Sequence, residues 1–216
     1  INDGSRDHTF EIIKDIRTKD KRFCYIHLSR NFGKENAMLA GFDHVHGDCC
    51  IIMDADLQHP IQVIPKMLKL WEQGYDDVYA KRNKSVKESG LREKVSITYY
   101  KILQKIANVD ILPNVGDFRL LDRKCINALK ELRETQRYTK GLYCWIGFNK
   151  KEVEFEQGDR TNGTSSFNYR KLFNLAIEGI TSYSIAPLRI STLLGIIVSI
   201  SAFFYMCYIF FKTIIL

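Results

Sequence analysis

Two carboxylates separated by one residue, Asp54 and Asp56, come directly after an apolar run at positions 49–53. Hard divalent cations prefer oxygen ligands, and Gln58, two residues further on, could add a neutral oxygen. A pair of acids with this spacing is a weak motif by itself, because solvated turns often contain it. Its place after a predicted buried strand favours a functional role. We predict that Asp54, Asp56 and Gln58 bind a hard divalent cation, which would neutralise a diphosphate.

Two polar turns near the start of the chain could bind the rest of a phosphate-rich ligand. In the turn Asp3-Gly4-Ser5, Asp3 could accept hydrogen bonds from a base or ribose, although the turn could equally be an ordinary one. Arg30 and Lys34 lie in the stretch RNFGK, ahead of a helical pattern. That stretch lacks the glycine spacing and the Ser or Thr of a P-loop, but its basic groups could still steady a diphosphate.

Further charged residues are candidates on weaker grounds. Asp117 and Arg119 flank Phe118 in a stretch that reads as an apolar loop, and they could form a local pair or belong to a site; we favour the site. The polar loop that begins at Arg160 could reach a phosphate. The basic stretch after position 80, with Arg82, Arg92 and Ser96, would usually be a solvated face, but it starts near the predicted sheet edge.

The elements that must position these residues alternate along the chain. Apolar runs predict strands at 23–28, 49–53 and 77–80, the second a buried parallel strand, and helical spacing predicts helices at 34–46 and 61–73. This alternation is typical of an open α/β sheet with helices on both faces. In such sheets ligands bind beyond the carboxyl ends of the strands, which is where Asp54 and Asp56 lie.

The end of the chain has the composition of a membrane anchor. No charged residue occurs from Ile190 to Phe211, a run that as a helix would be about 33 Å long, enough for one bilayer crossing. Positions 166–185 predict an amphipathic helix, either on the membrane surface or packed on the globule, and Pro187 should break the chain before the span. Arg170, Lys171 and Arg189 favour a cytoplasmic globule.

Charge and cysteine content narrow the alternatives. The net charge of +7 and the pI of about 9.0 suit nucleic acid, an anionic membrane or a phosphate-rich ligand. The aromatic residues lie mostly in apolar runs rather than among basic residues, which argues against nucleic acid. The six cysteines lack C-x-x-C spacing, and we expect reduced packing residues in a cytoplasmic domain.

The motifs, taken in order, resemble family 2 glycosyltransferases of the polyprenyl-phosphate class: the bactoprenol glucosyltransferases and, more distantly, the dolichol-phosphate mannose synthases. The similar segments are NDGSRD at 2–7, RNFGKENAMLAGF at 30–42, DADLQHP at 54–60, GDFRLLDR at 116–123, KGLYCWIGF at 140–148 and RTNGTSSFNYRKL at 160–172. They cover nearly all of the chain ahead of the apolar segment. The resemblance implies a GT-A fold and a metal-dependent, inverting sugar transfer, with Asp54, Asp56 and Gln58 holding Mg²⁺ or Mn²⁺ against the diphosphate.

The resemblance also implies residue roles. The nucleotide-sugar-binding residues would be Asp3, Ser5, Arg30, Lys34, Asp54 and Arg160, and the acceptor-phosphate-binding residues would be Arg82, Arg92, Ser96 and Arg119. Asp117 corresponds to an acid proposed as the catalytic base in the glucosyl branch, which favours UDP-glucose as donor and undecaprenyl phosphate as acceptor. A phosphate acceptor is already anionic near neutral pH, so Asp117 could orient it more than deprotonate it.

Several departures and alternatives accompany this interpretation. Ser166 stands where many relatives have a lysine, and the first strand and a second membrane span are missing, so we expect a fragment. We expect a catalytic domain at 1–165, an amphipathic juxtamembrane helix at 166–188 and a transmembrane helix at 189–216, in a bacterial inner membrane. A homo-oligomer is compatible with the sequence. The alternatives are mannosyl transfer from GDP-mannose and a non-catalytic, membrane-tethered nucleotide-sugar binder; a processive synthase would show Q-x-x-R-W, which is missing.

Overall fold

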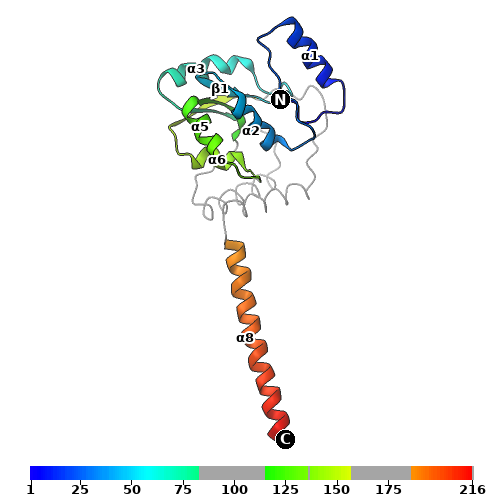
Figure 1. The fold of residues 1–216 in the computed structure, drawn as a ribbon. Helices are drawn as coiled ribbons and strands as arrows, with labels where there is room; N and C mark the ends of the chain where they lie inside the picture. Colours follow the sequence, from blue (N-terminus) through cyan, green and yellow to red (C-terminus); the bar gives the residue numbers. More distant parts are fainter. Residues whose placement is uncertain (83–114, 136, 157–185, 216) are drawn as a thin grey trace.

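A four-stranded sheet with strand order β1-β3-β2-β4 lies at the centre of the globular part. The structure is a computed structural model that describes residues 1–82, 115–135, 137–156 and 186–215. Within these residues the strands are β1 (Cys49–Ile52), β2 (Asp77–Arg82), β3 (Val115–Asp122) and β4 (Lys150–Phe155). Figure 1 shows helices packed around this sheet and one long helix leading away from it.

The sheet is mixed. β3 pairs antiparallel with β1 and with β2, whereas β2 and β4 are parallel. The prediction of a buried parallel strand at 49–53 is therefore wrong in two respects: β1 pairs antiparallel with β3, and it is half-buried because it lies at an edge of the described sheet. The loop predicted around Asp117 and Arg119 is also wrong, since both residues lie within β3.

Helices cover both faces of the sheet, as predicted. On one face η1 (Ile61–Val63) and α3 (Ile64–Glu72) pack through Val63 and Met67 against a cluster that contains Leu120. On the other face α2 (Lys34–His44), α5 (Arg123–Glu131) and α6 (Thr139–Trp145) surround Leu121. Because successive side chains of a strand point to opposite faces, the neighbours Leu120 and Leu121 belong to two different cores.

Asp122 joins the two layers at the end of β3. One of its carboxylate oxygens accepts a hydrogen bond from the backbone N–H of Lys124 at 2.9 Å and caps α5. The other accepts a hydrogen bond from Nε1 of Trp71 in α3 at 2.7 Å. The end of β3 is thus tied to helices on both faces, which holds the strand that carries Asp117.

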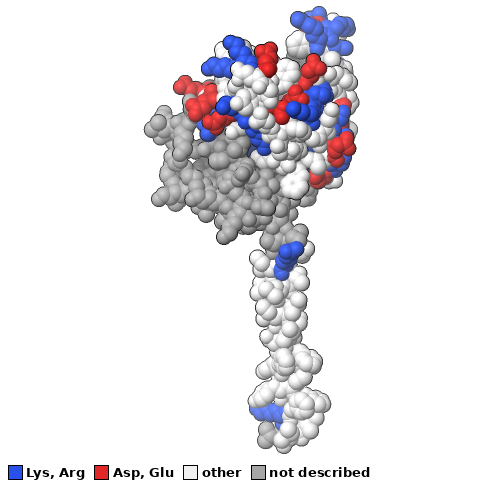
Figure 2. Space-filling model, turned by 90° about the vertical axis from the view of Figure 1, so that its left-hand side faces the viewer, with Lys and Arg blue, Asp and Glu red and all other residues white. Residues whose placement is uncertain are grey.

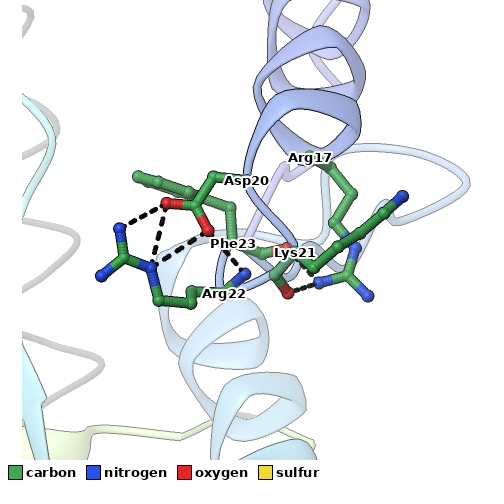
Figure 3. A network of polar contacts seen from close by, with 5 residues as sticks. All are labelled: Arg17, Asp20, Lys21, Arg22 and Phe23. Carbon is green, nitrogen blue, oxygen red and sulfur yellow. Dashed lines mark hydrogen bonds and ion pairs between the residues drawn. The ribbon is translucent and has the colours of Figure 1, made fainter.

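A surface helix that was not predicted, α1 (Thr9–Lys19), precedes the first predicted strand and has no buried residue. Polar contacts hold the turn after it (Figure 3). The Asp20 carboxylate accepts hydrogen bonds from the backbone and the guanidinium of Arg22, which lowers the pKa of Asp20. The Arg17 guanidinium donates to the carbonyl oxygens of Lys21 and Phe23.

The strand predicted at 23–28 is reduced to a single bridge in the described residues. Asn2 pairs in parallel with His27. The Asn2 N–H donates to the Ile26 carbonyl at 2.8 Å, and the Asn2 carbonyl accepts from the Leu28 N–H at 3.0 Å. This short pairing places the first turn of the chain beside the segment that leads to Arg30.

The predicted apolar span is a helix. In α8 (Ala186–Ile215), residues Leu188–Ile215 are long and apolar enough to cross a membrane by length and composition. Figure 2 shows charged side chains over the globule and very few along this helix. Pro187, expected to break the chain before the span, lies within α8 directly after its first described residue; proline is accepted in a first helical turn.

Some predicted features lie outside the described residues. These are the amphipathic helix at 166–185 and the candidate ligands Arg92, Ser96 and Arg160. All six cysteines have free thiols, and Cys24 is exposed rather than a packing residue.

Candidate active site

The register of β1 and β3 brings Asp54 and Asp117 together. In this antiparallel pair Ile52 lies opposite Arg119, so continuing the same register two residues beyond β1 places Asp54 opposite Asp117. Residues that face each other across a strand pair project from the same face of the sheet. Two acids that are 63 positions apart in the sequence therefore approach one another at the end of β1.

Lys34 joins these two carboxylates. Its Nζ lies 2.7 Å from Oδ1 and 2.9 Å from Oδ2 of Asp54, and 2.7 Å from Oδ2 of Asp117. Burial disfavours the charged ammonium, but the carboxylates of Asp117 and Asp54 outweigh that cost and raise the pKa of Lys34. The Asp54 and Lys34 side chains are partly exposed, whereas that of Asp117 is only 8% exposed.

The backbone that carries Lys34 is held by the first turn of the chain. The two oxygens of Asp3 accept hydrogen bonds from the backbone N–H groups of Phe32, at 2.7 Å, and Gly33, at 2.9 Å. Gly33, with φ of +90°, is the N-cap of α2, and Lys34 is the first residue of that helix. Asp3 therefore organises the loop that delivers Lys34.

Ser5 and Arg30 lie on the same two loops. The Ser5 N–H donates to the side-chain oxygen of Asn2 at 3.0 Å, and the Ser5 side chain is exposed. The guanidinium of Arg30 lies over the ring of Phe32, 4.1 Å from its centroid, and is also exposed. The structure thus brings four predicted nucleotide-sugar ligands, Asp3, Ser5, Arg30 and Lys34, to adjoining loops.

The predicted metal ligands occupy a tight turn. Oδ1 of Asp56 accepts a hydrogen bond from the Gln58 N–H at 3.1 Å, and Leu57 between them has φ of +60°, unusual for a residue with a side chain. In the described residues no group of three or more His, Cys, Asp or Glu side chains could hold a metal ion. The donor set suits Mg²⁺ or Mn²⁺, which commonly combine one or two carboxylates with phosphate oxygens of a ligand.

His59 is a site residue that the sequence analysis missed. Its ring stacks on Phe118 with centroids 4.7 Å apart, and its Nδ1 lies 3.3 Å from the backbone nitrogen of Asp54. Burial lowers the pKa of His59, against the opposing field of Asp54 and Asp56. The imidazole therefore supports the acidic turn by accepting the hydrogen bond of the Asp54 N–H. The segment DADLQHP contained this residue, but no spacing rule pointed to its contact with β3.

Glu35 is a second residue that was missed, and it anchors α2 to α6. Its Oε2 accepts a hydrogen bond from the backbone N–H of Thr139 at 2.9 Å. Burial raises the pKa of Glu35, although the contact with Thr139 opposes the rise. Lys34 and Glu35 thus connect the start of α2 to β3 and to α6.

Arg119 occupies a position that does not suit its predicted role. It is 3% exposed, its guanidinium forms an ion pair with Asp77 at 2.8 Å, and it lies 3.6 Å from the ring centroid of Tyr143. Burial raises the pKa of Asp77, and the charge of Arg119 opposes that rise. A guanidinium enclosed in this way is poorly placed to bind the phosphate of a lipid, and the acceptor-phosphate role of Arg119 stays a prediction.

Arg82, another predicted acceptor ligand, is exposed at the end of β2. It follows Lys81, which forms an ion pair with Glu152 of the neighbouring strand at 2.8 Å. No described contact joins Arg82 to Asp54 or Asp117, so its role stays a prediction.

Comparison with known proteins decides the family. The profile described as glycosyl transferase family 2 matches residues 1–129. The chain belongs to this family. Among similar proteins, CsbB of Bacillus subtilis is 46% identical over 212 residues, which cover 98% of this chain and 64% of CsbB. The prophage bactoprenol glucosyl transferase homolog of Escherichia coli is 43% identical and the bactoprenol glucosyl transferase of Shigella phage SfX is 42% identical.

Both of these bactoprenol relatives align over 215 residues, which cover 100% of this family 2 chain and 70% of each relative. The chain therefore spans about two thirds of the length of the relatives it matches, from 64% for CsbB to 70% for these two. The similarity confirms the predicted resemblance to the bactoprenol branch of family 2.

Proposed function

We propose that the protein is an inverting glycosyltransferase that moves glucose from UDP-glucose to undecaprenyl phosphate or a similar polyprenyl phosphate, with Mg²⁺ or Mn²⁺. The observation that carries this proposal is the convergence of Lys34, Asp54 and Asp117 beside the Asp54–Gln58 turn, in a family 2 chain. Relatives named as bactoprenol glucosyl transferases, similar over the whole chain, support the choice of lipid and sugar.

The donor would lie across the two loops that Asp3 ties together. Two of the lone pairs of the Asp3 carboxylate are used by Phe32 and Gly33, and an ionised carboxylate has about four such acceptor sites. Asp3 can thus hold the loop and still accept a hydrogen bond from a nucleotide. Ser5 and Arg30 are exposed beside it, and Arg160 would complete the phosphate contacts.

The metal would be held by Asp54, Asp56 and Gln58 together with the donor phosphates. When bound, such an ion supplies positive charge at the leaving diphosphate. Lys34 contacts the same Asp54 carboxylate and could stabilise the diphosphate as it leaves. In the transfer an acceptor phosphate oxygen bonds to the anomeric carbon as the bond from that carbon to the diphosphate breaks, which inverts the configuration.

Asp117 has a positioning role in this proposal. Its Oδ2 is 2.7 Å from Lys34, its side chain is 8% exposed, and an anionic phosphate acceptor needs little deprotonation near neutral pH. Asp117 therefore positions the ammonium of Lys34 beside the site where the nucleotide-sugar donor would bind. Rate enhancement would come mainly from positioning and charge stabilisation.

The membrane side of the proposal rests on α8. A helix that can cross a bilayer would keep the site next to a lipid acceptor. Arg189 near its start favours a globule on the cytoplasmic side of a bacterial inner membrane, where nucleotide sugars occur. Arg82, Arg92 and Ser96 stay the predicted acceptor-phosphate ligands.

The test is transfer of radiolabelled sugar to undecaprenyl phosphate by the full-length protein in detergent with Mg²⁺. Lipid-linked label from UDP-glucose that is lost with a chelator or in Asp56→Ala would support the donor, the acceptor and the metal together. Label from GDP-mannose instead would keep the mechanism and replace the sugar. No label from any nucleotide sugar would contradict the proposed activity and favour a binding protein.

A further inference from the structure

Lys34 uses the same carboxylate that a divalent cation would need. Its Nζ lies 2.7 and 2.9 Å from the two oxygens of Asp54, so both oxygens face the ammonium. The third contact, 2.7 Å to Oδ2 of Asp117, holds the ammonium between two acids, one in the segment just after β1 and one within β3. A divalent cation bound by Asp54 would be repelled by an ammonium at that distance.

The local charge also favours an exchange of cations. Among the described residues, the charged groups that act most strongly on His59 are the acids Asp54, Asp56 and Asp117 and the base Lys34, so these acids exceed this base by two negative charges. Lys34 alone cannot neutralise this group, whereas a divalent cation can. Without any cation, Asp54 and the buried Asp117 would repel one another across the strand pair.

The loop geometry confines any movement to the side chain of Lys34. The preceding N–H, of Gly33, donates to Asp3 at 2.9 Å, which fixes the backbone. The Lys34 side chain is 47% exposed and ends a flexible four-carbon stem, so its ammonium can leave Asp54 without unfolding α2.

We propose that Lys34 is a tethered counter-ion that competes with the divalent cation for Asp54 and turns to the donor diphosphate once the cation binds. Metal binding and displacement of Lys34 are then one coupled event. The identity of the metal and the donor rests on the proposed function, whereas the competition rests on the contacts of Lys34. Metal alone binds weakly for this reason, and metal with a diphosphate binds tightly because the displaced ammonium gains a new anionic partner.

The test is Mn²⁺ binding to the full-length protein in detergent, followed by the spectroscopic signal of free Mn²⁺, for wild type and Lys34→Met. Removing one competing, partly exposed ion pair should tighten Mn²⁺ binding about two- to fivefold. With UDP present, wild type should bind Mn²⁺ more tightly than Lys34→Met does, because the variant lacks the ammonium that contacts the diphosphate. Lys124→Met, which removes the ion pair of Lys124 with Asp76 at 2.6 Å, is the matched control and leaves Mn²⁺ affinity unchanged.

A second variant keeps the test valid if Lys34→Met does not fold. The double change Lys34→Met with Asp117→Asn removes one positive and one negative charge, so the net charge of the group is that of wild type. Tighter Mn²⁺ binding by this variant would show competition rather than a charge effect. Mn²⁺ binding equal to or weaker than that of wild type, in either folded variant, overturns the proposal.

The same samples separate this inference from the proposed function. Wild type that transfers sugar while the Lys34 variants bind Mn²⁺ no more tightly than it does would leave the function standing and refute the competition. Tighter Mn²⁺ binding by the variants, with no transfer by wild type from any nucleotide sugar, would support the competition and refute the function.

Discussion

Gly4 lies where the first turn of the chain meets the loop that carries Lys34, and its replacement by alanine is a sharp test of that contact. A Cβ at Gly4 would lie 2.4 Å from the backbone carbon of Arg30 and 2.6 Å from the backbone nitrogen of Asn31. The φ of Gly4 is +68°, where a side chain costs about 1–2 kcal/mol. Backbone overlap adds about 1–3 kcal/mol, so Gly4→Ala should lower the free energy of unfolding by about 2–5 kcal/mol.

Gly147→Ala is the matched control. Gly147 has φ of +72°, nearly that of Gly4, but among the described residues a Cβ there would meet only the Trp145 carbonyl oxygen, at an ordinary 3.9 Å. It should therefore cost only the backbone contribution of about 1–2 kcal/mol. The difference between the stability losses of the two variants therefore reports the backbone overlap at Gly4, where the two loops meet.

The assay is thermal unfolding of the full-length protein in detergent, followed by UDP binding. At this chain length about 1 kcal/mol corresponds to roughly 2–4 °C in Tm, so Gly4→Ala should unfold several degrees below Gly147→Ala. Gly4→Ala should also weaken UDP binding, because the hydrogen bonds from Phe32 and Gly33 to Asp3 need close loops. Equal Tm losses in the two variants, with UDP binding intact in both, would refute the inferred loop contact.

Three further predictions test the packing, the electrostatics and the metal turn. Arg119→Met should lower the free energy of unfolding by about 3–5 kcal/mol in denaturant titration, because it leaves Asp77 buried without its partner; a loss under about 1 kcal/mol would contradict the buried pair. Burial raises the pKa of Glu35 above its ordinary 4.5, so ionisation of Glu35 destabilises the folded protein as the pH rises. Glu35→Gln can still accept the Thr139 N–H, and its Tm relative to that of wild type should therefore increase between pH 4.5 and 8. A Tm difference between the two proteins that does not change with pH would contradict this prediction. Asp56→Ala should abolish the Tm increase that Mn²⁺ with UDP gives to wild type, and an unchanged increase would remove Asp56 from the metal site.

Much of the architecture could be predicted from local sequence alone. The helices at 34–46 and 61–73 were visible because their apolar residues recur at helical spacing, and the long apolar helix was visible because it lacks charge. Strand β3 was hidden because its pattern is broken by Asp117 and Arg119, which would be unfavourable inside a sheet without partners. Those partners, Lys34 and Asp77, are remote in the sequence.

The sequence by itself determined which chemical groups are present: the acidic turn at 54–58, the Asp3 turn, the basic loop before α2 and a helix that can cross a membrane. Only the tertiary structure decided which of them meet. The antiparallel register of β1 and β3 sets Asp54 opposite Asp117, and a shift of one residue would turn one of them to the other face. Strand register and loop contacts depend on residues far apart in the chain, which is why the sequence contained Lys34 and Arg119 but did not reveal their partners, Asp117 and Asp77.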